Sequence, residues 1–168
     1  MVKTIQLKNG LRLVLEYIPH VQSAAMGIWT NVGAVNENDD VSGISHFIEH
    51  MMFKGTENRS AKEIASDIDK LGGQINAFTG KEATCYYIKT ISDNLLKGAE
   101  VLVDMLENSQ FLDEEMDKER KVIEEEIKMT QDTPDELAID EMIELIFKGK
   151  PYGNSIIGTP KSLAFNTL

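Results

Sequence analysis

Alternating hydrophobic and polar positions predict a β-hairpin at the start of the chain and a third strand soon after it. Residues 3–8 and 11–18 alternate with a period of two, and the Asn-Gly dipeptide between them is typical of hairpin turns with positive backbone φ angles. Residues 23–33 are small and apolar throughout, which predicts a strand buried on both faces. We therefore expect Trp29 in the hydrophobic core.

The rest of the chain combines one more pair of strands with a succession of helices. Residues 74–79 and 83–91 predict two paired strands around a Gly-Lys turn. Several segments then follow residues that favour helix starts. These start signals are Ser42, Ser60 with Glu63, Ser92, Asp113, and Thr133-Pro134 with Glu136. The sequence therefore predicts an α+β fold in which helices pack on an antiparallel or mixed β-sheet.

The composition is that of one globular domain without a surface for nucleic acid or membranes. The 168 residues suffice for a single core, and the net charge of −11 argues against nucleic-acid binding, which needs a basic surface. No targeting peptide is visible, and no apolar run is long enough to span a membrane. We therefore expect a cytoplasmic protein. The acidic charge can favour cationic partners, or it can simply keep the surface solvated.

The stretch HFIEHMMFKGT, residues 46–56, contains two of the three histidines in the chain. On a helix, Glu49 and His50 lie about 60° and 40° to either side of His46, so all three project from one face. Two imidazoles four residues apart can bind one zinc ion, and Glu49 beside them can accept a proton from water. Histidines satisfied within a core are the alternative, but the shared face favours a metal centre. The order His-x-x-Glu-His is the inverzincin signature.

A catalytic zinc site needs a third protein ligand, and the lack of another suitable histidine leaves a carboxylate. The acidic segment 113–130 predicts a helix with an apolar stripe spanning roughly 140° of its surface. The stripe consists of Met116, Val122, Ile123 and Ile127. Glu119 and Glu126 fall within it, where an unpaired carboxylate is costly, whereas Glu124 and Glu125 point away from it. One of the first pair should bind the metal and the other support the site, and periodicity alone does not distinguish them.

Four segments, in this order and spacing, resemble the pitrilysin-type zinc peptidases, in particular the branch of the mitochondrial processing peptidase. They are HFIEHMMFKGT, GGQINAFTGKEATCYY, DKERKVIEEEI and YGNSIIGT, and the resemblance covers essentially the whole chain. It implies that Zn²⁺ is bound by His46, His50 and Glu126. It further implies that Glu49 is the general base and that Glu119 supports the site. The family fold, a sheet flanked by helices, agrees with the α+β prediction.

The same resemblance predicts how substrates and partner chains meet this domain. In the family, the segment matching GGQINAFT offers a strand edge to which the substrate adds a strand. The corresponding substrate-binding residues are Gly73, Asn76, Ala77 and Phe78. Family members contain two or more homologous domains, and the second half also binds substrate. We therefore expect residues 1–168 to form a single catalytic domain, truncated before its end, that works with a second homologous half or a homodimeric or heterodimeric partner.

The predicted function is that of a zinc-dependent endopeptidase of the processing-protease type, which hydrolyses peptides or unfolded polypeptides with zinc-activated water. The alternative is a noncatalytic structural or partner subunit that retains the peptidase fold. Such relatives usually lose motif residues, whereas this chain keeps all of them, which favours catalysis. From the isolated chain we expect weak cleavage or none, because the second half helps to hold the substrate in place.

Overall fold

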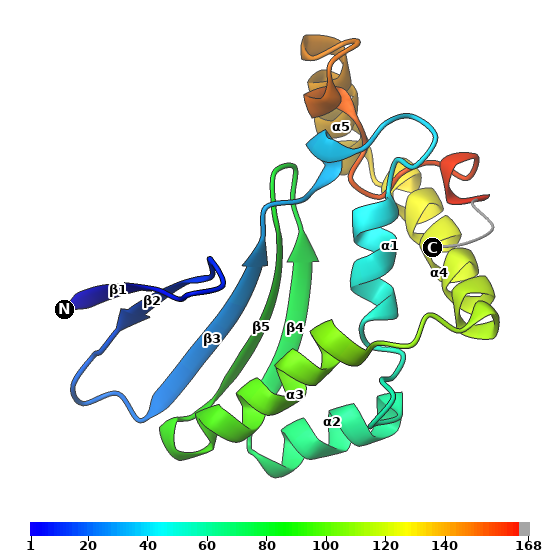
Figure 1. Ribbon diagram of the computed structural model, residues 1–168. Helices are drawn as coiled ribbons and strands as arrows, with labels where there is room; N and C mark the ends of the chain where they lie inside the picture. The colour runs from blue at the N-terminus through cyan, green and yellow to red at the C-terminus, as the bar shows by residue number, and fades with distance from the viewer. Residues whose placement is uncertain (165–168) are drawn as a thin grey trace.

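The computed structural model describes residues 1–164 and shows an α+β fold, as the sequence predicts (Figure 1). Its main sheet is antiparallel and has three strands, β3 (Ser23–Thr30), β4 (Gln74–Thr79) and β5 (Thr84–Ile91). The strand order is β3-β5-β4, so the predicted pairing of β4 with β5 is confirmed. In this order β4 is an edge strand.

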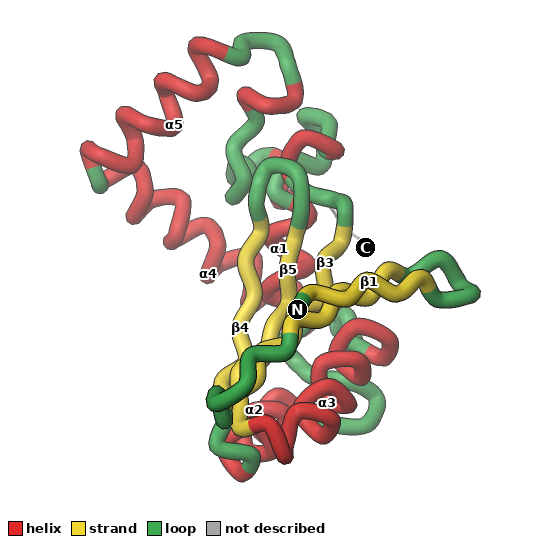
Figure 2. The backbone as a smooth tube through the Cα atoms, turned by 90° about the vertical axis from the view of Figure 1, so that its left-hand side faces the viewer, coloured by secondary structure: helices red, strands yellow, loops and turns green. Residues whose placement is uncertain are grey.

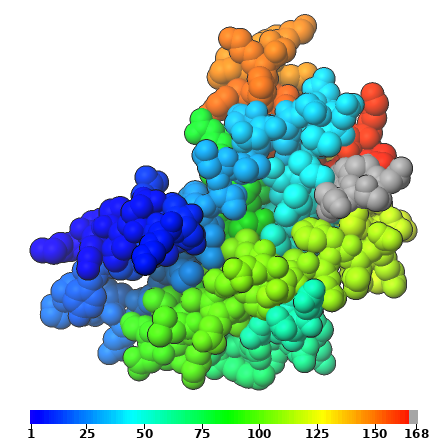
Figure 3. Space-filling view, in the orientation of Figure 1, coloured from blue at the N-terminus to red at the C-terminus, as the bar shows by residue number. Residues whose placement is uncertain are grey.

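A separate two-stranded antiparallel sheet is formed by β1 (Val2–Gln6) and β2 (Arg12–Glu16). This hairpin projects from the body of the molecule (Figure 1, Figure 3), and almost all of its residues are exposed. The predicted hairpin is confirmed, but its turn differs from the predicted one. Gly10 has a φ of 92°, whereas the φ of Asn9 is not positive. The Asn9 side chain instead accepts a hydrogen bond from the Leu11 N–H at 3.1 Å.

Strand β3 is exposed along one face, so the prediction that both faces are buried is wrong. Its residues alternate between exposed and partly buried positions, because the helices cover only one face of the sheet (Figure 1). Trp29 projects from the uncovered face and is 64% exposed, contrary to its predicted place in the core. Its ring packs edge-on against Phe78 of β4, with the ring centroids 5.4 Å apart.

All the predicted helices are present. Helix α5 lies near the end of the sheet that carries the β4–β5 turn, and α2 and α3 lie near the opposite end (Figure 1, Figure 2). The helices are α1 (Ile44–Met51), α2 (Ala61–Lys70), α3 (Leu95–Asn108), α4 (Asp113–Asp132) and α5 (Pro134–Ile146).

The predicted helix caps are confirmed in part. At the start of α2, the Glu63 N–H donates to the Ser60 hydroxyl at 3.3 Å, and the Ser60 N–H donates to the Glu63 carboxylate at 2.8 Å. Pro134 occupies the first turn of α5, as predicted. The side chains of Ser92 and Thr133 do not cap their helices, because both hydroxyls donate to backbone carbonyl groups instead.

Two hydrophobic clusters hold these elements together. The first, between the sheet and helices α2 and α3, consists of Met52, Ile64, Ile68, Ala77, Tyr86, Ile88, Val101, Leu102 and Met105. The second, which joins α1 to α4, consists of Phe47, Met51, Met116, Ile123, Ile127 and Leu163. Helix α1 and the residue that follows it contribute to both clusters. Packing therefore fixes the helix that carries the histidine motif between the sheet and α4.

Within residues 1–164, no helix combines the length and apolar character needed to cross a membrane. The predicted cytoplasmic location stays a prediction. The predicted domain extends to residue 168, and its last four residues lie outside the described part of the chain.

Candidate metal centre

Helix α1 presents its motif residues on one side, as the sequence predicts, and its apolar residues on another. Phe47 and Met51 are completely buried, whereas His46, Glu49 and His50 are only partly buried. Helix α4 lies alongside α1 (Figure 1), and the cluster that joins the two helices sets their relative rotation. This rotation turns two α4 glutamates toward the histidines.

The start of α1 is capped by Glu37 and not by Ser42, so the predicted cap is wrong. The buried Glu37 carboxylate accepts hydrogen bonds from the backbone N–H groups of Gly43, at 2.7 Å, and Ser45, at 2.8 Å. Gly43 has a φ of 88°, which glycine adopts readily. A Cβ atom there would lie 2.8 Å from the Cα of Gly158. A carboxylate from a preceding loop thus satisfies N–H groups at the helix start and complements its dipole.

Three side chains, two from α1 and one from α4, bring atoms that can bind a metal close together. The Nε2 atoms of His46 and His50 lie 3.2 Å apart, and Glu126 Oε2 lies 3.9 Å from the first and 3.7 Å from the second. Ligands at tetrahedral zinc, with bonds of 2.0–2.1 Å, are about 3.3 Å from one another. The observed spacing therefore needs little adjustment to fit one zinc ion. In the described part of the chain, no other group of three or more His, Cys, Asp or Glu side chains is found close enough to hold a metal.

The environment of His46 favours the neutral imidazole that metals bind. Burial, together with the smaller effect of the neighbouring His50, lowers the pKa of His46 to about 4. His46 is therefore uncharged at neutral pH. Its Nδ1 atom is buried and has no hydrogen-bond partner among the described residues. This desolvated ring, whose Nε2 faces a second imidazole and a carboxylate, fits the donor set of a zinc site.

Glu119 contacts the second histidine, His50, at the ring nitrogen that does not face His46. Its Oε1 lies 2.9 Å from His50 Nδ1, and its Oε2 forms an ion pair with Lys54. An Nδ1–H that donates to a carboxylate leaves Nε2 free to bind a metal. The predicted burial of Glu119 is confirmed, since it is 4% exposed. Glu126 lies at the margin of the buried stripe, with its side chain 39% exposed, and Val122, predicted within the stripe, is exposed.

Glu49 contacts the end of the edge strand. Its Oε2 accepts a hydrogen bond from the hydroxyl of Thr79, the last residue of β4, at 2.5 Å. The carboxylate is also close enough to Tyr86 to raise the pKa of that phenol, which burial raises more strongly. The predicted general base is therefore held against the strand that is predicted to bind substrate.

An open cleft of about 440 Å³ lies between α1, the end of β4 and α5, and His46 and Glu49 are part of its wall. Of the four predicted substrate-binding residues, Ala77 and Phe78 also line this cleft. The other two, Gly73 and Asn76, line a second depression farther along β4 instead. The structure thus brings half of this predicted set to the candidate site.

Two further features of the cleft bear on ligand binding. On β4, the Ala77 N–H donates to the side-chain oxygen of the preceding residue, Asn76, at 2.8 Å. Helix α5 contributes Glu136, Ile139 and Asp140 to the lining. Carboxylates from α1 and α5 therefore give this cleft an acidic character.

The comparison with known families decides the classification. The profile of insulinase, peptidase family M16, matches residues 12–160. The chain belongs to the M16 peptidase family. The predicted membership of the pitrilysin-type peptidases is thus confirmed.

Similar proteins match the chain over nearly its whole length or all of it. A Bacillus subtilis protein, named an uncharacterized zinc protease, is 44% identical over 164 residues, which are 98% of this chain and 40% of that protein. A protease from Helicobacter pylori, 30% identical, superposes with a TM-score of 0.90 over all of this chain and 41% of its own. An M16 inactive domain from Pseudomonas fluorescens shares the fold, with a TM-score of 0.91 at 15% identity, over all of this chain and 41% of its own. The chain spans about 40% of the length of these relatives.

Three contacts of this M16 site are missing from the sequence prediction, namely those of Glu37, Lys54 and Thr79. Lys54 follows His50 by four residues, and that spacing is a local signal that could have drawn attention to it. Glu37 and Thr79 come from other segments of the chain, and no sequence spacing links them to the motif. The fold of the loop before α1 brings Glu37 to the helix start, and the packing of α1 against the sheet brings Thr79 to Glu49.

Proposed function

We propose that this M16 chain is the zinc-binding, catalytic part of an endopeptidase. The observation that carries the proposal is the convergence of two imidazole nitrogens and one carboxylate oxygen to within 3.9 Å of one another. Glu49, a candidate base, projects from the same side of α1 and lines the adjacent cleft. Histidines with a purely structural role would need neither this third donor nor a base beside them.

Each polar residue of the site then has a defined part in the reaction. The proposed zinc ligands are His46, His50 and Glu126. Bound zinc supplies Lewis acidity, which lowers the pKa of water and polarises a peptide carbonyl. Glu49 accepts the proton of the attacking water and delivers it to the leaving amine. Thr79 orients the Glu49 carboxylate through its hydrogen bond, so that the base keeps one position during both proton transfers.

We further propose that the substrate adds a strand to the free edge of β4, from Gly73 to Phe78. The last two residues of this stretch line the cleft beside α1, which supports the proposal. The Ala77 N–H is available to a peptide carbonyl once its hydrogen bond to Asn76 opens. Main-chain pairing of this kind tolerates varied side chains, as a peptidase that acts on peptides or unfolded polypeptides requires.

The acidic lining of the cleft supports a preference for cationic peptides. Glu136 and Asp140 of α5 are part of its lining. The chain as a whole carries a net charge of −11. Such a field raises the local concentration of positively charged ligands and favours lysine or arginine near the scissile bond. The preference should be modest, because the carboxylates of α5 are exposed.

A second homologous half, or a homodimeric or heterodimeric partner, completes the proposed enzyme. This chain spans about 40% of the length of the relatives that it matches, which supports a further part in the working enzyme. The site is an open cleft, which a facing domain can close over a bound peptide. Catalysis needs a peptide held within about 1 Å of the productive position. We therefore expect weak cleavage by this chain alone and stronger cleavage with the complementary part of an M16 enzyme.

The second candidate function is that of a noncatalytic subunit. The inactive M16 domain from Pseudomonas fluorescens favours it, because that domain has the same fold. At 15% identity, however, the likeness concerns the fold alone. The presence of both histidines, the base and the facing carboxylate favours the catalytic function for this chain.

Zinc binding and peptide cleavage, measured on the same variants, test the proposal. The chain should bind about one equivalent of zinc. Glu126→Gln should weaken binding strongly, because a neutral amide is a poor substitute for a charged ligand. Glu49→Gln should keep the metal and lose cleavage in the complete assembly. The matched control is Glu125→Gln, an exposed residue next to the ligand. Equal zinc affinity in the wild-type chain and the Glu126 variant would refute the site.

A further inference from the structure

Lys54 follows the end of α1 and interacts with His50 through the carboxylate of Glu119. Glu119 Oε1 lies 2.9 Å from His50 Nδ1, and Glu119 Oε2 forms an ion pair with the Lys54 ammonium. The Glu119 side chain is 5% exposed and that of Lys54 is 29% exposed. Each oxygen of this buried carboxylate therefore has its own partner. If one partner were removed, the carboxylate could rotate away from the other.

The backbone that carries Lys54 is held on both of its sides. The Lys54 N–H donates to the Met51 carbonyl at 3.0 Å, which continues the last turn of α1. The next residue, Gly55, has a φ of 125° and accepts a hydrogen bond from the Gln110 N–H at 3.0 Å. The following segment thus pairs with the residues that lead into α4, the helix that carries Glu119. The two ends of the ion pair are therefore linked through the main chain as well.

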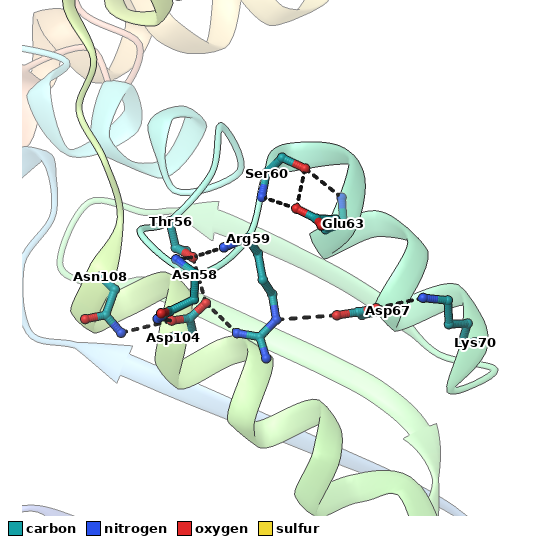
Figure 4. Close-up of polar contacts among 9 residues, drawn as sticks. All are labelled: Thr56, Asn58, Arg59, Ser60, Glu63, Asp67, Lys70, Asp104 and Asn108. Atoms are coloured by element: carbon teal, nitrogen blue, oxygen red, sulfur yellow. Dashed lines mark hydrogen bonds and ion pairs between the residues drawn. The ribbon is translucent and has the colours of Figure 1, made fainter.

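A buried aspartate on α3 fixes the same segment from below (Figure 4). Asp104 accepts hydrogen bonds from the Thr56 hydroxyl at 2.7 Å, the Asn58 amide at 2.5 Å, the Arg59 guanidinium at 2.6 Å and the Asn108 amide at 2.9 Å. Three of these donors lie within five residues of Lys54. A lysine on a mobile loop would lose backbone entropy in addition to side-chain entropy on pairing. Here the anchored backbone limits that loss.

We propose that Lys54 is a positioning residue for the metal centre. Its ammonium fixes the carboxylate of Glu119, and Glu119 in turn fixes the ring of His50 with Nε2 directed at the zinc position. This inference rests on the proposed zinc site and goes beyond it, because it assigns a role to a residue that touches neither metal nor substrate. The simpler reading is that Lys54 only neutralises a buried charge. The two readings differ in whether zinc affinity depends on Lys54.

The test measures the zinc affinity of the 168-residue chain by competition with a chromophoric chelator, with the melting temperature recorded for every variant. Lys54→Met should weaken zinc binding about 10-fold, the lower end of the effect of residues that orient metal ligands. Lys54→Arg, which retains the charge and the donors, should recover most of that affinity. The matched control is Lys118→Met, which removes the two ion pairs that this exposed lysine forms with Glu114 and Glu115 on α4.

A double variant separates positioning from charge balance. In a Glu119→Gln background, Lys54→Met should change zinc affinity by less than about 2-fold, because the residue through which it acts has lost its carboxylate. The visible spectrum of the Co²⁺-loaded chain should also change in Lys54→Met and return in Lys54→Arg. A Lys54→Met chain that melts at a lower temperature but binds zinc like the wild type would overturn the inference and leave the zinc site intact. A wild-type chain that fails to bind zinc would overturn both.

Discussion

The hydroxyl of Thr79, at the end of β4, donates a hydrogen bond to the carboxylate of Glu49 on α1 over 2.5 Å. The proposed general base is thus tied to the strand that is proposed to bind the substrate. A peptide paired with β4 and the base that acts on it therefore share one structural element. Strand β4 would therefore position both the bound peptide and the Glu49 carboxylate.

Replacement of Thr79 should therefore affect catalysis more than binding. Thr79→Val, in the assembly that cleaves peptides, should lower kcat about 10-fold, because the base loses the hydrogen bond that orients it. KM for a fluorogenic peptide and zinc content should stay close to wild-type values. Thr79→Ser keeps the hydroxyl and should stay near wild-type activity. A loss of zinc in Thr79→Val would show that the residue supports the metal site and not the base.

A proline at position 77 should block substrate pairing without removing the metal. Ala77→Pro deletes the N–H that now donates to Asn76 and that we expect to pair with a peptide. Proline is tolerated on edge strands, so the sheet should survive. We expect KM to rise at least about 10-fold at unchanged zinc content. Ala77→Val adds a similar volume but keeps the N–H, and it should bind peptides normally. Equal kinetics for the proline and valine variants would exclude the proposed role of the edge.

The carboxylates of α5 should discriminate between cationic and neutral peptides. Neutralisation of both Glu136 and Asp140, by Gln and Asn respectively, should raise KM about 10-fold for a peptide with arginine near the scissile bond. KM for a matched peptide with a neutral residue at that position should hardly change. Added salt should reduce the difference. Glu141→Gln, on the same helix but outside the cleft lining, is the control. An equal effect on both peptides would argue against charge recognition.

Asp104 should make the stability of the chain depend on acidic pH. Burial raises the pKa of Asp104, but its four hydrogen bonds outweigh burial and lower the pKa to about 2. The value in the unfolded chain is about 3.8. The stabilisation is therefore complete above about pH 4 and is lost as the pH falls toward 2. Asp104→Asn should lower the free energy of unfolding by about 2 kcal/mol at pH 7, and much less at pH 2.

Urea denaturation of the wild type and of Asp104→Asn at several pH values measures this difference. Asp69→Asn, an exposed substitution on α2, is the control and should have little effect at any pH. A difference between wild type and Asp104→Asn that does not vary with pH would mean that the charge of Asp104 is unimportant. Only the shape of its hydrogen-bonding group would then matter.

The sequence by itself determined the features that depend on local spacing. His46, Glu49 and His50 share one face of α1 because their separations match the helical period, whatever the helix packs against. The capping box of Ser60 and Glu63 is likewise local, since both partners lie within one turn. The burial of Glu119 also follows from periodicity, because Glu119 lies at helical spacing between Met116 and Ile123, which are both buried.

The tertiary structure decided every contact that depends on which helix or sheet faces pack against each other. Periodicity assigns Trp29 to an apolar strand, but its ring is exposed because no helix within residues 1–164 covers that face of the sheet. Glu126 faces the histidines from a helix that begins more than sixty residues after the motif, because the core between α1 and α4 fixes their relative rotation. Glu37 replaces Ser42 as the cap of α1 because the loop between residues 37 and 43 folds back and brings its carboxylate to the helix start. A sequence specifies the face that each element buries, and close packing of side chains selects the partner of that face.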